Sequence, residues 1–412
     1  MEYLRKISQL KVFRHSYKDP LDFYNHVLVM PNHVASITGL DVLKTDYKKS
    51  SFNFVGLILV ILLFFYVTFF TVYEMRHHVE DLIYCLVTIG ICLQVVMKIY
   101  THLYYRDNLL WIQEYTKELF QEETAAHKAV LMGYIEVLNV IAKAVLLAYG
   151  SCSCTMLTVP IVFTLLSGHK TLTFGFWLPF IDRFSWHGWI LNMVMQIVMS
   201  IVIVSEDIGL DIIYFMTVMC SVMQIDLLKA KLQNVNAKME KGETDITEEL
   251  NDIFKRHYEH MEFVRIVEKV YRSYFFVLFS TLGTSLVLVL YAIVTVCSHI
   301  LHWNSKINVF NFQLSWIAGY GSAVFITYQL FVFCLLPTLL GTKKEELQRE
   351  IYDISWYTWT IQNQKVLRFM LEAAQQPNCF SMIFYPLSMP TFTEVIRTIY
   401  SILALLLTFR SD

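Results

Sequence analysis

The sequence predicts an all-α membrane protein with seven transmembrane helices, a cytoplasmic N-terminus, an extracellular C-terminus and a helical cytoplasmic anchor. Of its 412 residues, 56% are hydrophobic and only 17% are charged, whereas a soluble domain carries about 25% charged residues. A water-soluble core cannot hide that much apolar surface, so much of it must face lipid. Two further observations support this fold class: seven long apolar segments, and an uneven distribution of Lys and Arg between the loops.

Seven segments are apolar enough to cross a bilayer, which takes about 20 residues of α-helix. They comprise residues 52–73, 82–100, 131–159, 188–220, 271–298, 312–340 and 379–409. The first contains no charged residue at all. The fourth is ambiguous, because the apolar stretch from 188 to 228 is long enough for two short spans and is interrupted by Glu206, Asp207 and Asp211.

The basic residues resolve this ambiguity. With seven spans, the loops on one side of the membrane hold 24 Lys and Arg and those on the other side hold 5. Loops rich in Lys and Arg stay in the cytoplasm. Two short spans within 188–228 would move the eight basic residues of the following loop to the outside. One long fourth span is therefore predicted, which places the N-terminus inside and the C-terminus outside.

The cytoplasmic segments have helical patterns of their own. Segment 226–269 reads as two amphipathic helices separated by a turn at 241–245, and segment 343–376 carries an apolar stripe suited to packing against another helix. No flexible linker or internal repeat divides the chain. We expect four parts, in this order: a cytoplasmic segment 1–51, six spans within 52–340, a cytoplasmic anchor helix 341–378 and a last helix 379–412.

Acidic residues inside the fourth span are functional candidates, because charge at membrane depth is costly. Glu206 and Asp207 lie near its middle. Two interpretations remain open: the carboxylates either pair with Lys143 of the third span or line a wet crevice that passes cations.

No pattern in the sequence indicates catalysis or metal binding. There is no nucleophile elbow and no phosphate-binding loop. Two His pairs, His257 with His260 and His299 with His302, lack a third nearby ligand. Cys152 and Cys154 lie near a helix end, where a loop disulfide is one option beside free thiols. We expect no enzyme, no catalytic residue, no metal, no cofactor and no nucleic-acid partner.

The C-terminal third carries a series of motifs. It contains the pair Trp356–Tyr357, then Ser388, Thr391 and Phe392 in a Ser-x-x-Thr-Phe step, then the pair Tyr400–Ser401. This series resembles the ending of insect odorant receptors. The chain lacks the extended loop between spans four and five of the odorant receptor co-receptor (Orco), so it resembles a ligand-tuning subunit. In the related gustatory receptors a Gln–Phe pair stands where this chain has Leu406–Leu407, which favours the odorant family.

The resemblance implies a ligand-gated, non-selective cation channel of four subunits around a central pore. The chain would be joined by Orco in a heterotetramer, in the cell membrane of olfactory sensory neuron dendrites, and would bind a small volatile ligand. An ungapped alignment of the last helix places Leu405 at a hydrophobic gate and Thr408 and Phe409 at the outer constriction. A ring of apolar side chains closes a pore by dewetting, and from the residues alone Leu403, Leu406 and Leu407 are equally open to that role.

The resemblance also implies a ligand cavity among the outer halves of spans two, three, four and six. Aromatic and methionine side chains there would suit a small apolar ligand, and one or two hydroxyl or amide groups would orient it. The candidates are Ile83, Tyr84 and Val87; Tyr149, Cys152 and Ser153; Met193, Gln196, Ile197 and Ser200; and Trp316, Ile317 and Tyr320.

Three other classes of protein compete with this interpretation. A gustatory channel of the same superfamily shares the topology. A seven-helix G-protein-coupled receptor needs an extracellular N-terminus, which the basic asymmetry opposes. A transporter would be supported by inverted repeats or paired broken helices, and the sequence has neither.

Overall fold

The computed structural model describes residues 6–8, 17–44, 46–48, 51–76, 79–122, 125–241, 246–302, 309–376 and 380–411. Within these ranges the side chains at 79–84, 122, 125–126, 296–302, 309–318 and 409–411 are outside the description.

Long helices make up nearly the whole fold. In chain order they are α2 (Pro20–Ile37), α3 (Phe52–Met75), α4 (Val79–Tyr104), α5 (Arg106–Glu122), α6 (Ala125–Ser167), α7 (Trp186–Glu240), α8 (Thr247–His302), α9 (Val309–Asp353), α10 (Ile361–Ala374) and α11 (Met389–Ser411). A single turn of 3-10 helix, Trp356–Thr358, precedes α10, and a two-stranded hairpin of β1 (Ser381–Met382) and β2 (Tyr385–Pro386) precedes α11. Seven helices are long and apolar enough to cross a membrane: α3, α4, α6, α7, α8, α9 and α11. The predicted number of spans is therefore confirmed.

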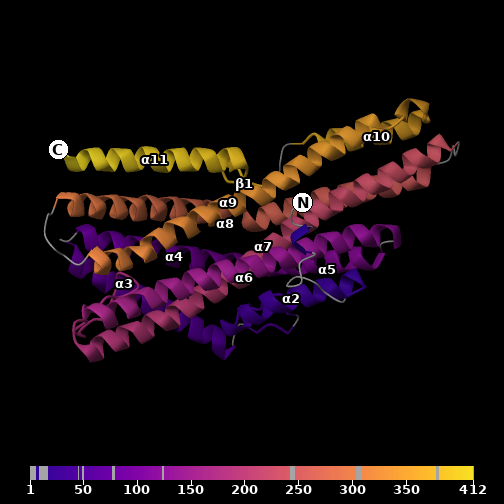
Figure 1. Cartoon of the computed structure of the whole chain (residues 1–412). Helices are drawn as coiled ribbons and strands as arrows, with labels where there is room; N and C mark the ends of the chain where they lie inside the picture. The colour runs from indigo at the N-terminus through magenta and orange to yellow at the C-terminus, as the bar shows by residue number, and fades with distance from the viewer. Residues whose placement is uncertain are drawn as a thin grey trace.

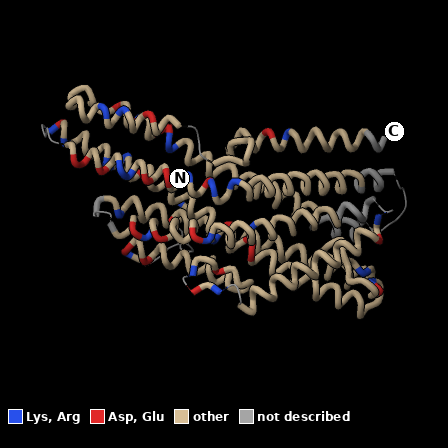
Figure 2. Tube along the Cα trace, turned by 180° about the vertical axis from the view of Figure 1, so that it is seen from behind, with Lys and Arg blue, Asp and Glu red and all other residues tan. Residues whose placement is uncertain are grey.

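The helices run along one long axis, and α7, α8 and α9 extend over most of its length (Figure 1). Charged residues gather at one end of the bundle (Figure 2), the end where α5 and α10 lie in Figure 1. The other half of the bundle carries few of them. Since a bilayer excludes charge, lipid surrounds the sparsely charged half, and the charged end projects into water as a helical skirt.

Helix α7 is the centre of the bundle and explains the long apolar stretch at 188–228. It packs against α2, α4, α6, α8 and α9, and nearly every side chain from Ile208 to Leu228 is buried. A helix that is apolar on nearly all sides is either a membrane span or buried inside protein, and the burial of these side chains identifies the second case. A side chain at Gly209 would place its Cβ 3.1 Å from that of Ala35, so this glycine allows α2 to approach. The stretch is one helix, as predicted, because its second half faces protein rather than lipid.

The last helix begins later than expected, and the predicted start at 379 is corrected to Met389. Residues 381–386 form the hairpin, whose turn holds Ile383 at a φ of 55°. The Ser388 and Thr391 hydroxyls lie 3.1 Å apart at the helix start, and Pro390 fits the first turn because it needs no hydrogen-bond acceptor there. The apolar residues before Met389 therefore belong to a hairpin that packs on α8, not to a span.

The predicted anchor helix at 341–378 is also corrected, because it consists of two pieces. Helix α9 continues from the sixth span to Asp353 without interruption. A break at 354–360 follows, and α10 then begins after Thr360, whose hydroxyl accepts a hydrogen bond from the Asn363 amide at 3.4 Å. Helix α10 packs on both α8 and α9.

Candidate ligand cavity

A cavity of about 470 Å³ lies at the end of the bundle where α6 connects to α7. This volume is within the range of about 300–1,000 Å³ that is typical of small-molecule sites. The helices supply mostly apolar walls: Val87, Thr88 and Ile91 from α4; Met156, Val159, Pro160 and Phe163 from α6; Val289 and Ala292 from α8; and Gly319 and Ser322 from α9. The remaining wall is the loop between α6 and α7, residues 168–185.

The α6–α7 loop is held in place by side chains of α7. The Gln196 carbonyl accepts hydrogen bonds from the amides of Thr173 (2.9 Å) and Phe174 (3.2 Å). Its amide nitrogen donates to the carbonyls of Phe174 (3.3 Å) and Phe176 (2.8 Å). The Trp189 indole donates to the Thr171 carbonyl at 2.7 Å. A buried amide that satisfies four backbone groups fixes the loop as a rigid wall of the cavity.

Two basic side chains of this loop also line the cavity, Lys170 and Arg183. The Lys170 ammonium lies 4.8 Å from the centre of the Trp186 ring and donates to the Phe184 carbonyl. The Arg183 guanidinium lies 3.9 Å from the centre of the Trp177 ring and 4.8 Å from that of Phe184. Aromatic faces therefore hold both cations at the cavity wall.

A network of buried polar side chains joins five helices within the membrane-spanning part of the bundle. The Lys98 ammonium lies 2.6 Å from a carboxylate oxygen of both Asp207 and Asp211. Tyr149 donates to Asp211 at 2.7 Å and Tyr274 does so at 3.1 Å. The Gln329 amide donates to the Tyr149 hydroxyl at 3.0 Å and adds α9 to the network. Charges at this depth are tolerated because they are paired and hydrogen-bonded.

The network corrects the prediction that Lys143 pairs with the acidic residues of the fourth span. Lys98 of α4, rather than Lys143 of α6, meets Asp207. The pairing interpretation holds for Asp207, with a different lysine. The Glu206 side chain is fully buried on another face of α7, and neither of its oxygens has a hydrogen-bond partner among the described residues.

Of the predicted ligand residues whose side chains are described, only Val87 lines the cavity, and the others have different surroundings. Gln196 fixes the loop, Tyr149 belongs to the charge network, and Ser153 and Ser200 form a hydrogen bond of 3.0 Å between α6 and α7. Met193 is buried, Cys152 and Ile197 are half-buried, and half of the Tyr320 side chain is exposed. The side chains of Ile83, Tyr84, Trp316 and Ile317 lie outside the described residues.

The contributions of α8 and of the α6–α7 loop to the cavity wall were not predicted from the sequence. The fourth span was expected to line the cavity, but among the described lining residues α7 supplies none and α8 supplies Val289 and Ala292. One signal was available in the loop. Lys170 and Arg183 lie in this loop together with the aromatic residues Phe174, Trp177 and Phe184, a composition that suits a recognition surface.

The predicted pore residues lie on α11, which is the least buried of the seven candidate spans in the described part of the chain. Helix α11 packs mainly against α8 and α9 and lies at the edge of the bundle (Figure 1). Leu405 is 54% exposed, and the Thr408 hydroxyl donates to the Leu405 carbonyl at 2.7 Å. The Phe409 side chain lies outside the described residues. An apolar helix face left open in the single chain is suited to contact with further subunits or with lipid.

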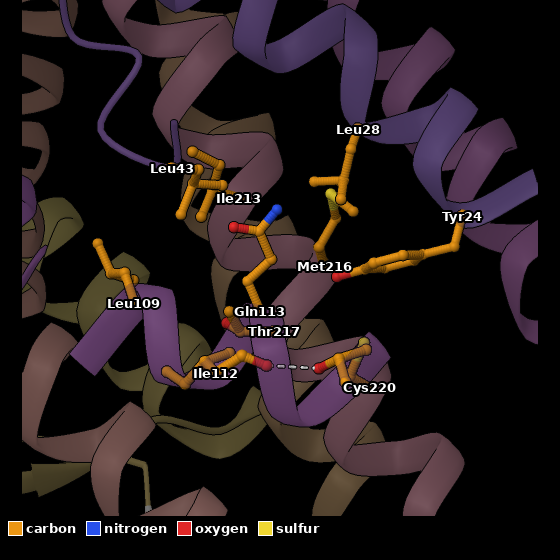
Figure 3. A pocket seen from close by; sticks show the side chains of 11 residues that line it. Tyr24, Leu28, Leu43, Leu109, Ile112, Gln113, Ile213, Met216, Thr217 and Cys220 are labelled. Atoms are coloured by element: carbon orange, nitrogen blue, oxygen red, sulfur yellow. Dashed lines mark hydrogen bonds between the residues drawn. The ribbon is translucent and has the colours of Figure 1, made fainter. Parts of the chain in front are cut away.

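A second, much smaller pocket lies between α2, α5 and α7 (Figure 3). Its volume is about 20 Å³, the room that one water molecule needs. In Figure 3 the side chains of Leu28 and Met216 point toward one another across it. It shares no described lining residue with the larger cavity, so it is a packing gap and not part of the candidate site.

The described residues contain neither a candidate metal site nor a disulfide at Cys152 or Cys154. No group of three or more His, Cys, Asp or Glu side chains there is placed to hold a metal ion. His260 instead shares a hydrogen bond of 3.2 Å with Gln224. Cys152 and Cys154 are both free thiols, so neither forms the loop disulfide among the described residues.

Seven candidate membrane-spanning helices, with a cavity of this size between four of them and the α6–α7 loop, define a multi-pass membrane protein with room for a small molecule. A family model described as 7tm Odorant receptor matches residues 78–400. The chain belongs to this odorant receptor family, whose fold is of the receptor or channel type and not that of an enzyme.

The similar proteins are distant in sequence, and those of solved structure share the fold. Odorant receptor 22a of Drosophila melanogaster is 22% identical over 237 residues, which are 57% of this chain and about half, 55%, of that receptor's length. The structure of the insect olfactory receptor OR5 from Machilis hrabei superimposes with a TM-score of 0.72 at 18% identity, over 93% of this chain and 99% of that one. The structure of the same receptor in complex with eugenol gives a TM-score of 0.73 at 17% identity, over 94% and 99%.

Proposed function

We propose that this chain is the ligand-tuning subunit of an odorant-gated, non-selective cation channel, and that it assembles with the odorant receptor co-receptor into a heterotetramer. The observation that carries the proposal is the cavity between α4, α6, α8 and α9 in a chain of the odorant receptor family. A similarly folded receptor has been solved in complex with the small molecule eugenol. A volatile organic ligand would occupy the cavity and change the packing of the helices around it.

The membrane orientation and site of action belong to the same proposal. The basic asymmetry of the loops supports an N-terminus and a charged end of the bundle in the cytoplasm, with the α6–α7 loop outside, where a ligand would arrive. The channel would work in the cell membrane of olfactory sensory neuron dendrites.

Two parts of the predicted ligand set take different roles in this proposal. Val87 would contact the ligand directly, because it lines the cavity. Gln196 would act on the ligand through the loop that it holds. The other described candidates would support the walls from behind.

The function is tested by recording from cells that express this chain together with the co-receptor. We expect volatile compounds to evoke a cation current within milliseconds that persists when G-protein signalling is blocked. Val87→Trp, which fills the cavity, should reduce the response to the activating compound at least about tenfold while surface labelling stays normal. Leu86→Trp is the matched control, because the neighbouring Leu86 is 43% exposed and does not line the cavity. Equal responses of the two variants would remove this cavity from the proposal.

The pore would be lined by α11, with Leu405 at the gate and Thr408 and Phe409 nearer the outside. The support is the exposed apolar face of α11 in the single chain and the dewetting of narrow apolar rings. In channels that carry Leu405→Cys, a charged, membrane-impermeant thiol reagent in the outer solution should irreversibly reduce the evoked current. Ile399→Cys is the control, because Ile399 is 5% exposed and faces the bundle. Modification from the cytoplasmic side alone would contradict the orientation, and no modification would remove Leu405 from the pore.

A further inference from the structure

Lys170 and Arg183 in the cavity wall differ from the largely buried lysines elsewhere in the described chain in having no carboxylate partner. Lys98, Lys229 and Lys343 are largely buried, and each lies within 3.2 Å of a carboxylate oxygen. Lys170 and Arg183 are half-buried, yet within the described part of the chain neither has a carboxylate within 4.0 Å. None of the described residues that line the cavity is acidic. The described wall therefore presents two cations without a protein counter-charge.

The way these cations are held leaves their donors available. Arg183 stacks on the Trp177 ring, and stacking uses the flat face of a guanidinium while its N–H groups point outward in the plane. Among the described residues no acceptor receives a hydrogen bond from Arg183. Lys170 uses one donor on the Phe184 carbonyl and has two more. Both side chains therefore keep hydrogen-bonding capacity that a ligand in the cavity can use.

We infer that the cavity selects organic acids: the ligand's carboxylate pairs with Arg183 and Lys170, and its hydrocarbon part lies against the apolar wall. This ligand class rests on the proposed function, which it makes more specific. Arg binds a carboxylate through two parallel, charge-assisted hydrogen bonds, and Lys adds a point charge. The apolar helical walls, with Ile91, Val159 and Phe163 among their lining residues, take the apolar part. An ammonium compound of the same size is repelled by the same two cations.

The inference is tested by binding to the purified full chain in nanodiscs of zwitterionic lipid. Tritiated hexanoate is the probe, and unlabelled hexanoic acid, hexanol and hexylamine compete with it at neutral pH. We expect saturable binding in which the acid competes at least about tenfold more strongly than the alcohol or the amine. Absence of saturable binding, or equal competition by all three compounds, overturns the inference.

Charge variants then assign the effect to these residues. Arg183→Gln and Lys170→Gln should each weaken hexanoate binding about tenfold, whereas Arg183→Lys, which keeps the charge, should retain most of it. The matched control is Arg76→Gln: Arg76 also stacks on an aromatic ring, that of Tyr73 at 4.4 Å, but does not line the cavity. Size-exclusion profiles verify that every variant is folded. Unchanged binding in folded Arg183→Gln and Lys170→Gln protein overturns the inference.

These binding measurements separate the inference from the proposed function. They need neither the co-receptor nor an open pore, so failure to record a current contradicts the channel proposal alone. Normal odorant-evoked currents combined with indifference to the ligand's charge contradict the acid selectivity alone.

Discussion

Replacing Lys98 with methionine is expected to prevent most of the protein from folding and reaching the cell surface. The Lys98 side chain is 1% exposed, and its ammonium is the ion-pair partner of both Asp207 and Asp211. Without it, two carboxylates remain inside the membrane with no counter-charge. Removing one partner of a buried ion pair costs about 3–5 kcal/mol, a large part of a total stability of about 5–15 kcal/mol. Surface biotinylation and size-exclusion profiles of the solubilised protein measure the loss.

Two comparisons isolate the charge effect in the Lys98 variant. Lys128→Met removes an exposed lysine whose pairing with Asp19 at 3.2 Å leaves both side chains more than 40% exposed, and such pairs contribute about 0–1 kcal/mol. This control should fold normally. The triple variant Lys98→Met, Asp207→Asn, Asp211→Asn removes the unpaired charges and should recover part of the surface expression. Normal expression of Lys98→Met alone would show that the network is not structural.

Gln196→Leu is expected to raise the odorant concentration needed for a half-maximal response at least about tenfold while the protein still reaches the surface. The substitution keeps the size of the side chain but removes four hydrogen bonds to the α6–α7 loop. Each buried backbone group left without a partner costs about 1–3 kcal/mol. The loop should therefore leave its position, and the cavity should lose the part of its wall that the loop forms. Dose–response curves of the co-expressed channel measure the effect.

Gln233→Leu is the matched control for Gln196→Leu. Gln233 is also on α7, but it is exposed at the charged end and makes one hydrogen bond, of 2.9 Å, to Glu350. It should leave the dose–response curve unchanged. Identical curves for Gln196→Leu and the unaltered chain would mean that the loop's position does not determine ligand binding.

The order of the helices along the chain was largely predictable, because each residue makes its own contribution to the free energy of transfer into a bilayer. The cost of placing an apolar or charged side chain in a bilayer depends mainly on that side chain and its depth. Seven spans, one uninterrupted helix through 188–228 and an amphipathic helical skirt follow from composition and from the positions of Lys and Arg. A pairing role for Asp207 followed in the same way, since an intramembrane carboxylate needs a partner.

The partners of each side chain could not be predicted from the sequence, because they depend on how the helices pack against one another. Lys98 and Lys143 both lie in apolar spans, and the rotation and height of α4 and α6 against α7 determine which of them meets Asp207. The hairpin at 381–386 is as apolar as a span, and its turn and hydrogen bonds to α8 distinguish it. Hydropathy contains no information about either contact.

The sequence by itself determined the class of fold, the number of crossings and the family, because these depend on hydrophobicity along one dimension and on a short C-terminal motif. Only the tertiary structure decided the composition of the cavity. A loop between two spans folds back over the bundle and supplies Lys170 and Arg183 to the wall, and α8 takes the place predicted for α7. The physical reason is that a cavity is the space left between packed elements, so its lining depends on distances between residues far apart in the chain.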